Sequence, residues 1–210
     1  MLDYGKLKQA VGDLDEETAL AMIDGVMADG GEDVGQAVLA CQEGLEIVGD
    51  LFSEGTYFIG DLIFAGELMT EALKKMKSAL ASGSGDQNKA KMILCTVAGD
   101  LHDIGKNIVK AFLEAAGFEV MDLGIDTPSE KIVDTAVQEG IKIIALSGVL
   151  TLAVDSMKEV VNICTARNIR DQVRIVVGGN PVSPEVCEFV GADAWAHAPQ
   201  DTVSACNSWI

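Results

Sequence analysis

The segment MILCTVAGDLHDIGKNIVKAFLEAAGFEVMDLG, residues 92–124, contains two apolar runs separated by an amphipathic stretch. The runs at 92–98 and 118–124 have the length and composition of buried strands, whereas 105–116 has helical periodicity. The alternation continues toward the end of the chain, with further apolar runs at 141–147, 173–179 and 192–197. Regular alternation of helices with continuously apolar strands predicts a parallel sheet that helices cover on both faces.

Five strands of this kind are typical of the flavodoxin-like, Rossmann-type doubly wound sheet. We expect this domain to span residues 89–210, with helices at 105–116, 128–139, 153–168 and 184–190 and a last one from about 199. Ligands of such sheets bind beyond the carboxyl ends of the strands, so a functional site is expected in the loops that follow them.

The first 80 residues have helical periodicity throughout. Helices are expected at 3–12, after a capping Asp15, after a capping Asp33, and from Tyr57 to about Leu80. They predict a four-helix bundle within residues 1–88, and ASGSGDQNK at 81–89 has the composition of a linker. Glycines inside the helices, such as Gly44 and Gly60, indicate either close helix contacts or a bulky group on a helix face.

Composition excludes several classes of function. With a formal net charge of −18, the chain is unsuited to binding nucleic acid or an anionic membrane surface. No apolar run has the length of a membrane span and the first residues lack a secretory signal, so a cytoplasmic location is expected. The five cysteines form no C-x-x-C pair and are interpreted as unpaired thiols.

Small residues fill the loops that follow four of the predicted strands, which suits a large ligand lying close to the backbone. These loops are 99–105, 147–151, 178–181 and 196–199.

The loop 99–105 contains His102, one of only two histidines, between two aspartates. The spacing of a phosphate-binding loop is absent, and the third strand ends in Ser147 where a response-regulator receiver has an aspartate. A helix-capping histidine is the simplest structural interpretation. The alternative is an axial metal ligand, because a macrocycle can supply the four positions that one histidine leaves open. Asp100 is close enough in sequence to accept the other ring N–H.

The D-x-H-x-x-G motif at 100–105, followed by Ser147 and Thr151 and then by Gly178–Gly179, resembles the signature of cobalamin-binding domains. With the helical half, the chain is similar to corrinoid proteins of anaerobic methyltransferase systems, such as methylamine, methanol and O-demethylase systems, and to the cobalamin-binding module of methionine synthase.

Three positions depart from the pattern of that family. Where the family has Ser-x-Leu, this chain has serine, glycine and Val149. Ala153 stands where methionine synthase has a relay serine, and Gly60 stands where the cap motif often has a proline. A proton relay beyond Asp100 is therefore an open question.

The resemblance implies that the dimethylbenzimidazole tail of cobalamin leaves the cobalt and enters the sheet domain, and that His102 replaces it as the lower ligand. Asp100 would hold the imidazole, Ser147 and Thr151 would hydrogen-bond the tail, and the motif glycines would make room for it. The residues expected to form the cofactor site are Gly99, Asp100, Leu101, His102, Asp103, Ile104, Gly105, Ile108, Ser147, Val149, Leu150, Thr151, Gly178, Gly179, Asn180, Ala196 and His197. For His197, a plain surface position is the alternative.

The same resemblance implies that the helical bundle caps the upper face of the corrin. The candidates for that cap face are Phe58, Leu62, Leu68 and Met69, for which core packing is the equally weighted alternative.

The implied function is that of a methyl carrier with methylcobalamin as its working form, not catalytic alone. Its partners would be a donor-specific methyltransferase, an acceptor methyltransferase that uses tetrahydrofolate or coenzyme M, and a reductive activation protein. A cobalamin-dependent mutase subunit and a cobalamin-sensing regulator are the alternatives; the latter requires a basic DNA-binding segment, which the sequence lacks.

Overall fold

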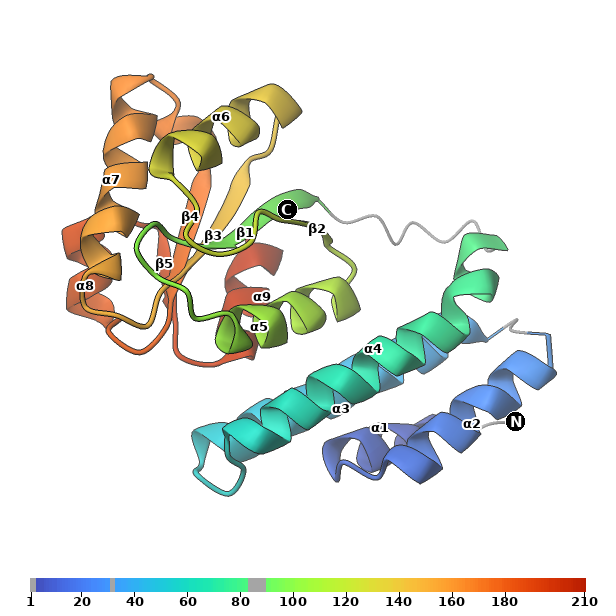
Figure 1. Cartoon of the computed structure of the whole chain (residues 1–210). Helices are drawn as coiled ribbons and strands as arrows, with labels where there is room; N and C mark the ends of the chain where they lie inside the picture. Colours follow the sequence, from blue (N-terminus) through green and yellow to red (C-terminus); the bar gives the residue numbers. More distant parts are fainter. Residues whose placement is uncertain (1–2, 31–32, 83–89) are drawn as a thin grey trace. The chain divides into compact units, whose positions relative to one another are not determined.

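The computed structural model describes residues 3–30, 33–82 and 90–210. The chain forms two compact units, Met1–Gln87 and Asn88–Ile210 (Figure 1). Most of the linker predicted at 81–89 lies outside the described residues.

The first unit is the four-helix arrangement that the sequence predicts. Its helices are α1 (Tyr4–Gly12), α2 (Glu16–Ala28), α3 (Val34–Ser53) and α4 (Ile59–Ser82). Asp15 caps α2 by accepting the Thr18 N–H at 3.1 Å, whereas Asp33 occupies the first cap position of α3 without a side-chain capping bond. Asp33 therefore stands at the predicted N-cap position, but its side chain does not make the hydrogen bond expected of a capping residue.

Glycine at position 44 is explained by helix packing. A Cβ at Gly44 would lie 2.6 Å from the Cβ of Val11, so α1 and α3 approach each other too closely for a side chain there. A Cβ at Gly60 would meet nothing within 4 Å. Close helix packing therefore explains the glycine at position 44 but not the glycine at position 60.

The second unit is the predicted doubly wound parallel sheet. Its strands are β1 (Lys91–Thr96), β2 (Glu119–Asp122), β3 (Ile143–Ser147), β4 (Arg174–Gly178) and β5 (Ala194–Ala196), in the spatial order β2-β1-β3-β4-β5. All adjacent pairs are parallel. This is the flavodoxin-like strand order, so the fold prediction is confirmed.

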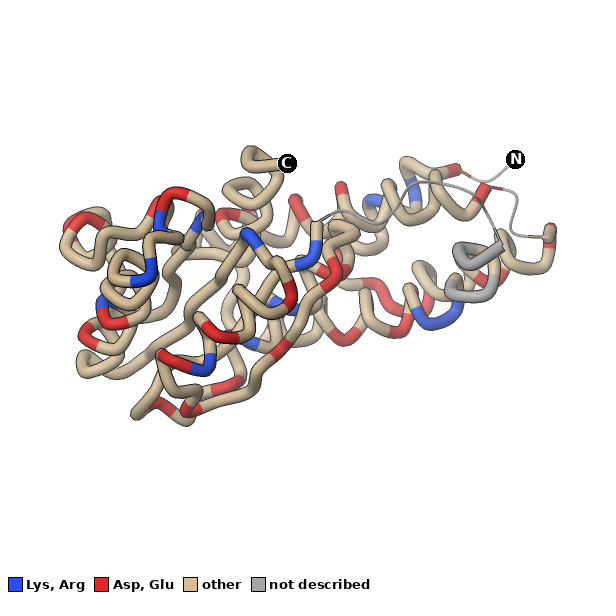
Figure 2. The backbone as a smooth tube through the Cα atoms, turned by 90° about the horizontal axis from the view of Figure 1, so that it is seen from above, with Lys and Arg blue, Asp and Glu red and all other residues tan. Residues whose placement is uncertain are grey.

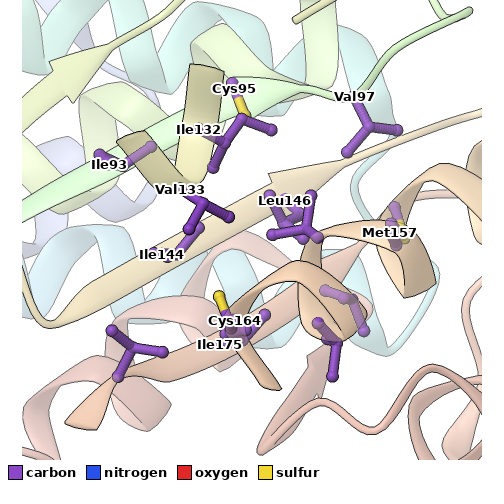
Figure 3. Close-up of a cluster of buried hydrophobic side chains, with 14 of the residues drawn as sticks. Ile93, Cys95, Val97, Ile132, Val133, Ile144, Leu146, Met157, Cys164 and Ile175 are labelled. Atoms are coloured by element: carbon purple, nitrogen blue, oxygen red, sulfur yellow. The ribbon is translucent and has the colours of Figure 1, made fainter. Parts of the chain in front are cut away.

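Helices cover both faces of the sheet (Figure 1). They are α5 (Ile104–Ala115), α6 (Ser129–Glu139), α7 (Ala153–Ala166), α8 (Pro184–Val190) and α9 (Pro199–Asn207). Ile93 and Cys95 of β1 belong to a cluster with residues of α6, α7 and α8 (Figure 3), whereas Met92 and Leu94 pack with residues of α5 and α9. Successive strand residues face opposite layers, which explains why the strands are apolar without alternation.

One short element was not predicted. The 3-10 helix η1 (Arg170–Gln172) follows α7, which ends two residues earlier than expected. Asn168 has a left-handed backbone with φ of 58°, and this conformation cannot continue a right-handed helix.

The negative charge is concentrated in the helical unit. Residues 1–87 contain 17 Asp and Glu against five Lys and Arg, whereas residues 88–210 contain 16 against ten. Figure 2 shows the distribution along the backbone. Within the described ranges, none of the helices combines the length and apolar character that crossing a bilayer requires.

Burial in the hydrophobic core makes most of the five cysteine thiols unreactive. All are free, and four are buried, Cys187 being the partly exposed one. Burial raises the pKa of Cys41, Cys95 and Cys206 to about 12. Because the thiolate is the reactive form, these thiols are chemically quiet in the folded protein.

We expect the native protein to react slowly with a thiol reagent such as dithionitrobenzoate at pH 8, with Cys187 reacting first. All five thiols should react after unfolding. A Cys187→Ala variant is the control and should lack the first phase. Rapid modification of several thiols in the native wild-type protein would contradict this expectation.

Candidate functional site

The carboxyl edge of the sheet brings four loops together because the strand ends are in register. Thr96 pairs with Ser147, Ser147 with Gly178, and Gly178 with Ala196. Each of these residues ends its strand, so the loops that follow β1, β3, β4 and β5 begin side by side. The edge predicted from the sequence therefore exists as a row of adjacent loops.

His102 lies in the loop between β1 and α5 and is bound to Asp100. Its Nδ1 is 2.6 Å from Asp100 Oδ1, and its backbone N–H donates to the same oxygen at 3.0 Å. Asp103 is the N-cap residue of α5, so the imidazole of His102 does not cap this helix. The His102 side chain is 54% exposed, and Nε2 makes no hydrogen bond within the described part of the chain.

Asp100 is fully buried and accepts bonds on both of its oxygens. Besides the two bonds from His102, Oδ2 accepts the backbone N–H groups of Val149 at 2.6 Å and Leu150 at 2.9 Å. Burial alone would raise the pKa of Asp100, but these hydrogen bonds, first that of Leu150 and then those of His102, hold it well below its usual range.

An ionised Asp100 fixes the tautomer of His102. A carboxylate only accepts hydrogen bonds, so Nδ1 donates its proton to Asp100, and in the neutral imidazole the lone pair is on Nε2. All the bonds to Asp100 come from His102 and from backbone N–H groups, and no side-chain hydroxyl among the described residues takes part. Ala153 is buried and offers no hydroxyl that could extend a relay.

The backbone of the His102 loop is braced by residues that the sequence analysis did not single out. Thr96 Oγ1 donates to the carbonyl oxygen of His102 at 2.8 Å, and Ser156 Oγ donates to that of Ala98 at 2.9 Å. The loop after β2 adds Asp126, which bonds to Gly99 and to Asp100. The turn-forming residues of Gly124–Pro128 were the available sequence signal for this loop.

The loops that follow β3 and β4 contact each other directly. Gly148 N–H donates to Gly178 O at 3.1 Å, and a Cβ at Gly179, where φ is +120°, would lie 1.9 Å from Gly148 O. Glycine is therefore required at 179 by the protein's own backbone, whatever ligand binds. At Gly105, by contrast, an added Cβ would meet nothing within 4 Å.

Apolar side chains surround His102 on this edge. Leu101 is 66% exposed and Ile104 58% exposed, and Val149 and Leu150 are also exposed. Solvated apolar groups on adjacent loops are typical of a surface that receives an apolar ligand. Among the other predicted residues, Asp103, Thr151, Asn180 and His197 are exposed, Ser147 is half-buried, and Ile108 and Ala196 are buried in the core.

The predicted cap face is mostly part of the hydrophobic core. Leu62, Leu68 and Met69 are at most 3% exposed and belong to the buried side of α4, which packs against α2 and α3. Phe58, which precedes α4, is 69% exposed. The core-packing alternative therefore describes the first three residues, and Phe58 is the remaining candidate.

The donor set fits a metal held mainly by a macrocycle. Among the described residues, no group of three or more His, Cys, Asp or Glu side chains could hold a metal ion. One imidazole with an available Nε2 could supply a single ligand to a metal whose other positions a macrocycle fills. The apolar rim around His102 suits the large face of such a ring.

A buried ion pair anchors the first turn of α5 beside this loop. Lys106 is 3% exposed, and its Nζ lies 2.6 Å from Asp122 Oδ2 at the end of β2. Burial would raise the pKa of Asp122, but the hydrogen bond from Lys106 and that from the Gly124 N–H lower it. The pair ties the helix that follows His102 to the neighbouring strand.

We expect Lys106→Met to lower the free energy of unfolding at pH 7 by about 2 kcal/mol, because Asp122 is left charged and partly buried without its close partner. Since the folded pKa of Asp122 is depressed, the contribution of the pair is complete above an ordinary aspartate pKa of about 4 and is lost as the pH falls further. The deficit in denaturant unfolding should therefore shrink in acid. Lys110→Met is the matched control, because Lys110 Nζ is 3.8 Å from the same carboxylate and should cost less than about 1 kcal/mol. Equal losses in the two variants would contradict the expectation.

Comparison with known proteins assigns the family. Profiles described as B12 binding domains match residues 90–205 and 4–77. A trimethylamine corrinoid protein of Methanosarcina acetivorans is 32% identical over 95% of this chain and 93% of its own. The crystal structure of a cobalamin-binding protein from Desulfitobacterium hafniense superposes with a TM-score of 0.89 at 44% identity, covering both chains fully. A methanol:cobalamin methyltransferase complex from Methanosarcina barkeri gives a TM-score of 0.73 at 25% identity, over 96% of this chain and 77% of that chain. The chain belongs to the family of B12-binding corrinoid proteins, and its cofactor is cobalamin.

Proposed function

We propose that this protein is a methyl carrier that binds cobalamin with its tail base displaced and with His102 as the lower cobalt ligand. It would receive a methyl group from a donor-specific methyltransferase and pass it to a second methyltransferase. Relatives named for trimethylamine and for a methanol:cobalamin methyltransferase complex support this role over those of a mutase subunit or a regulator.

The observation that carries the proposal is the environment of His102. Its Nδ1 is engaged by a buried carboxylate, whereas Nε2 is available on an exposed ring among apolar side chains. A carboxylate–histidine pair orients the imidazole and strengthens it as a ligand. The bound corrin supplies a cobalt centre that takes up and releases methyl groups.

The residues of the chain perform the supporting tasks. Asp100 holds the proton on Nδ1 and keeps the ring in one orientation, and the exposed Leu101, Ile104 and Leu150 provide an apolar surface for the macrocycle. Ser147 and Thr151, at the end of β3 and in the loop after it, are the groups we assign to the tail of the cofactor. We assign the activation of the methyl donor and of the methyl acceptor to the partner enzymes.

The partners we propose are a donor-specific methyltransferase, an acceptor methyltransferase that uses tetrahydrofolate or coenzyme M, and a protein that reductively reactivates the cobalt. The acidic helical unit suits partners with basic docking surfaces. Among the exposed apolar residues of that unit, we assign Phe58 to covering the methyl-bearing face of the corrin.

The proposal is tested by the visible absorption spectrum of the protein reconstituted with methylcobalamin. We expect a spectrum of base-displaced, histidine-ligated cobalamin in the wild-type protein and of base-displaced cobalamin without the histidine in His102→Ala. His197→Ala is the comparison variant, because it removes the only other histidine of the sequence and that residue is also exposed at this edge. His197 is expected beside the tail of the cofactor and not on cobalt, so whatever cobalamin this variant binds should still give the histidine-ligated spectrum. A wild-type spectrum that still shows the tail base on cobalt would refute the proposed ligation.

Gly105→Ala tests whether the ligand approaches the backbone at the motif glycine. Nothing in the protein lies within 4 Å of the added Cβ, so the apoprotein should keep its stability or gain up to about 1 kcal/mol. Corrinoid binding should weaken at least about tenfold, as expected for a contact worth roughly 1.4 kcal/mol.

Gly35→Ala is the control for this substitution. Gly35 is also the second residue of its helix, and an added Cβ there would likewise meet nothing within 4 Å. Its corrinoid affinity, measured by spectroscopic titration beside that of Gly105→Ala, should equal that of the wild-type protein. Unchanged binding in both variants would place the ligand away from Gly105.

A further inference from the structure

The loop between β2 and α6 contacts the backbone on both sides of the Asp100 Cα. The carboxylate of Asp126 accepts the Gly99 N–H at 2.8 Å. The backbone N–H of Asp126 donates to the carbonyl oxygen of Asp100 at 3.0 Å. One residue of a neighbouring loop therefore bonds to the peptide group that precedes Gly99 and to the peptide group that follows Asp100.

The segment that presents Asp126 is itself attached to the end of β1. Thr96 N–H donates to Gly124 O at 2.9 Å, and Thr127 N–H donates to Thr96 O at 3.1 Å. Val97 and Thr127 form a parallel bridge. These bonds continue the pairing between β1 and the segment of β2 past the ends of the two strands. Residues before and after Asp126 are therefore hydrogen-bonded to the end of β1.

The backbone of Asp126 is in the left-handed region, with φ of +47°. This conformation costs an ordinary residue roughly 1–2 kcal/mol, less for aspartate or asparagine. Leu14 and Asn168 are the other non-glycine residues with positive φ among those described. Glycine would satisfy the turn without strain, so the turn geometry alone does not explain a carboxylate at this position.

We propose that Asp126 is a positioning residue for His102, acting through Gly99 and Asp100. By fixing the peptide groups at the two ends of the Gly99–Asp100 segment, it sets where the Asp100 carboxylate lies and therefore how the imidazole is held. The inference rests on the proposed ligation of cobalt by His102 and extends it to a loop outside the D-x-H-x-x-G motif. Loss of the Asp126 carboxylate leaves the fold and the motif in place but lets the imidazole adopt several orientations.

Three variants separate the hydrogen bond from the turn. Asp126→Gly keeps the left-handed backbone and its N–H bond to Asp100 but removes the acceptor for Gly99. Asp126→Asn keeps both the conformation and an acceptor oxygen. Asn168→Gly is the matched control, because it makes the same kind of change at a left-handed residue that follows α7, away from the His102 loop.

Two readouts report on the imidazole and not on stability. The first is the ¹⁵N spectrum of His102 in the apoprotein, which distinguishes the two ring tautomers and needs to resolve only two histidines. The second is the fraction of histidine-ligated cobalamin in the visible spectrum, together with the corrinoid dissociation constant.

We expect Asp126→Gly to lose the single Nδ1–H tautomer, to show a smaller histidine-ligated fraction and to bind corrinoid about tenfold more weakly, as is typical when an outer partner of a metal-bound histidine is removed. Asp126→Asn and Asn168→Gly should match the wild-type protein. Wild-type tautomer, spectrum and affinity in Asp126→Gly would overturn the inference.

The wild-type apoprotein gives a further check that does not depend on how the variants fold. The Gly99 amide belongs to an exposed residue and should nevertheless be protected from hydrogen exchange by the Asp126 carboxylate. Exchange at the rate of an unstructured peptide would overturn the inference. If the wild-type holoprotein instead lacks histidine-ligated cobalamin, the proposed function fails, whereas a ligated wild type with an unaffected Asp126→Gly removes only the role of Asp126.

Discussion

The geometry of the carboxyl edge of the sheet depends on one buried carboxylate, that of Asp100. It is removed from water, which is unfavourable for a charged group unless hydrogen bonds replace those of the solvent. Its bonds come from the ring and the backbone of His102 and from the N–H groups of Val149 and Leu150. A shift of either loop would leave part of the carboxylate unsatisfied, so the imidazole and the loop after β3 are held in one arrangement.

The topology of the sheet makes this interaction possible. Asp100 and its partners at 149 and 150 are about fifty residues apart in the sequence. They meet because β1 and β3 are neighbours and because Thr96 and Ser147, the last residues of these strands, are in register. In addition, Val97 N–H donates to Ser147 O at 3.0 Å just beyond the strands. The crossover through β2 and α6 thus creates the site by making two distant segments adjacent.

Local patterns in the sequence were sufficient for the elements and for the central pair of the site. Apolar runs and helical spacing predicted the strands and helices, because each depends on residues close together in the chain. The contact between Asp100 and His102 spans two residues and was predictable for the same reason. The comparisons confirm the cofactor to which these residues pointed.

Features that depend on distant contacts were not predictable in this way. Asp126 and Lys106 acquire their roles only when β2 lies beside β1 and α5 packs against that edge. The burial of Leu62 and Met69 was ambiguous, because the same helical spacing serves a core and a ligand-facing surface. From the sequence, Gly179 was interpreted as a glycine that leaves room for a ligand. In the structure, the carbonyl oxygen of Gly148 already leaves no room for a side chain at this position.

The use of backbone N–H groups as partners of Asp100 has a consequence for sequence divergence. Every amino acid except proline supplies such a donor, so positions 149 and 150 can change their side chains without altering the surroundings of the carboxylate. Replacement of the family's leucine by Val149 is then of no consequence for Asp100. Side chains at these two positions can therefore change the outer surface of the loop while the hydrogen bonds that surround Asp100, and with them the setting of His102, stay the same.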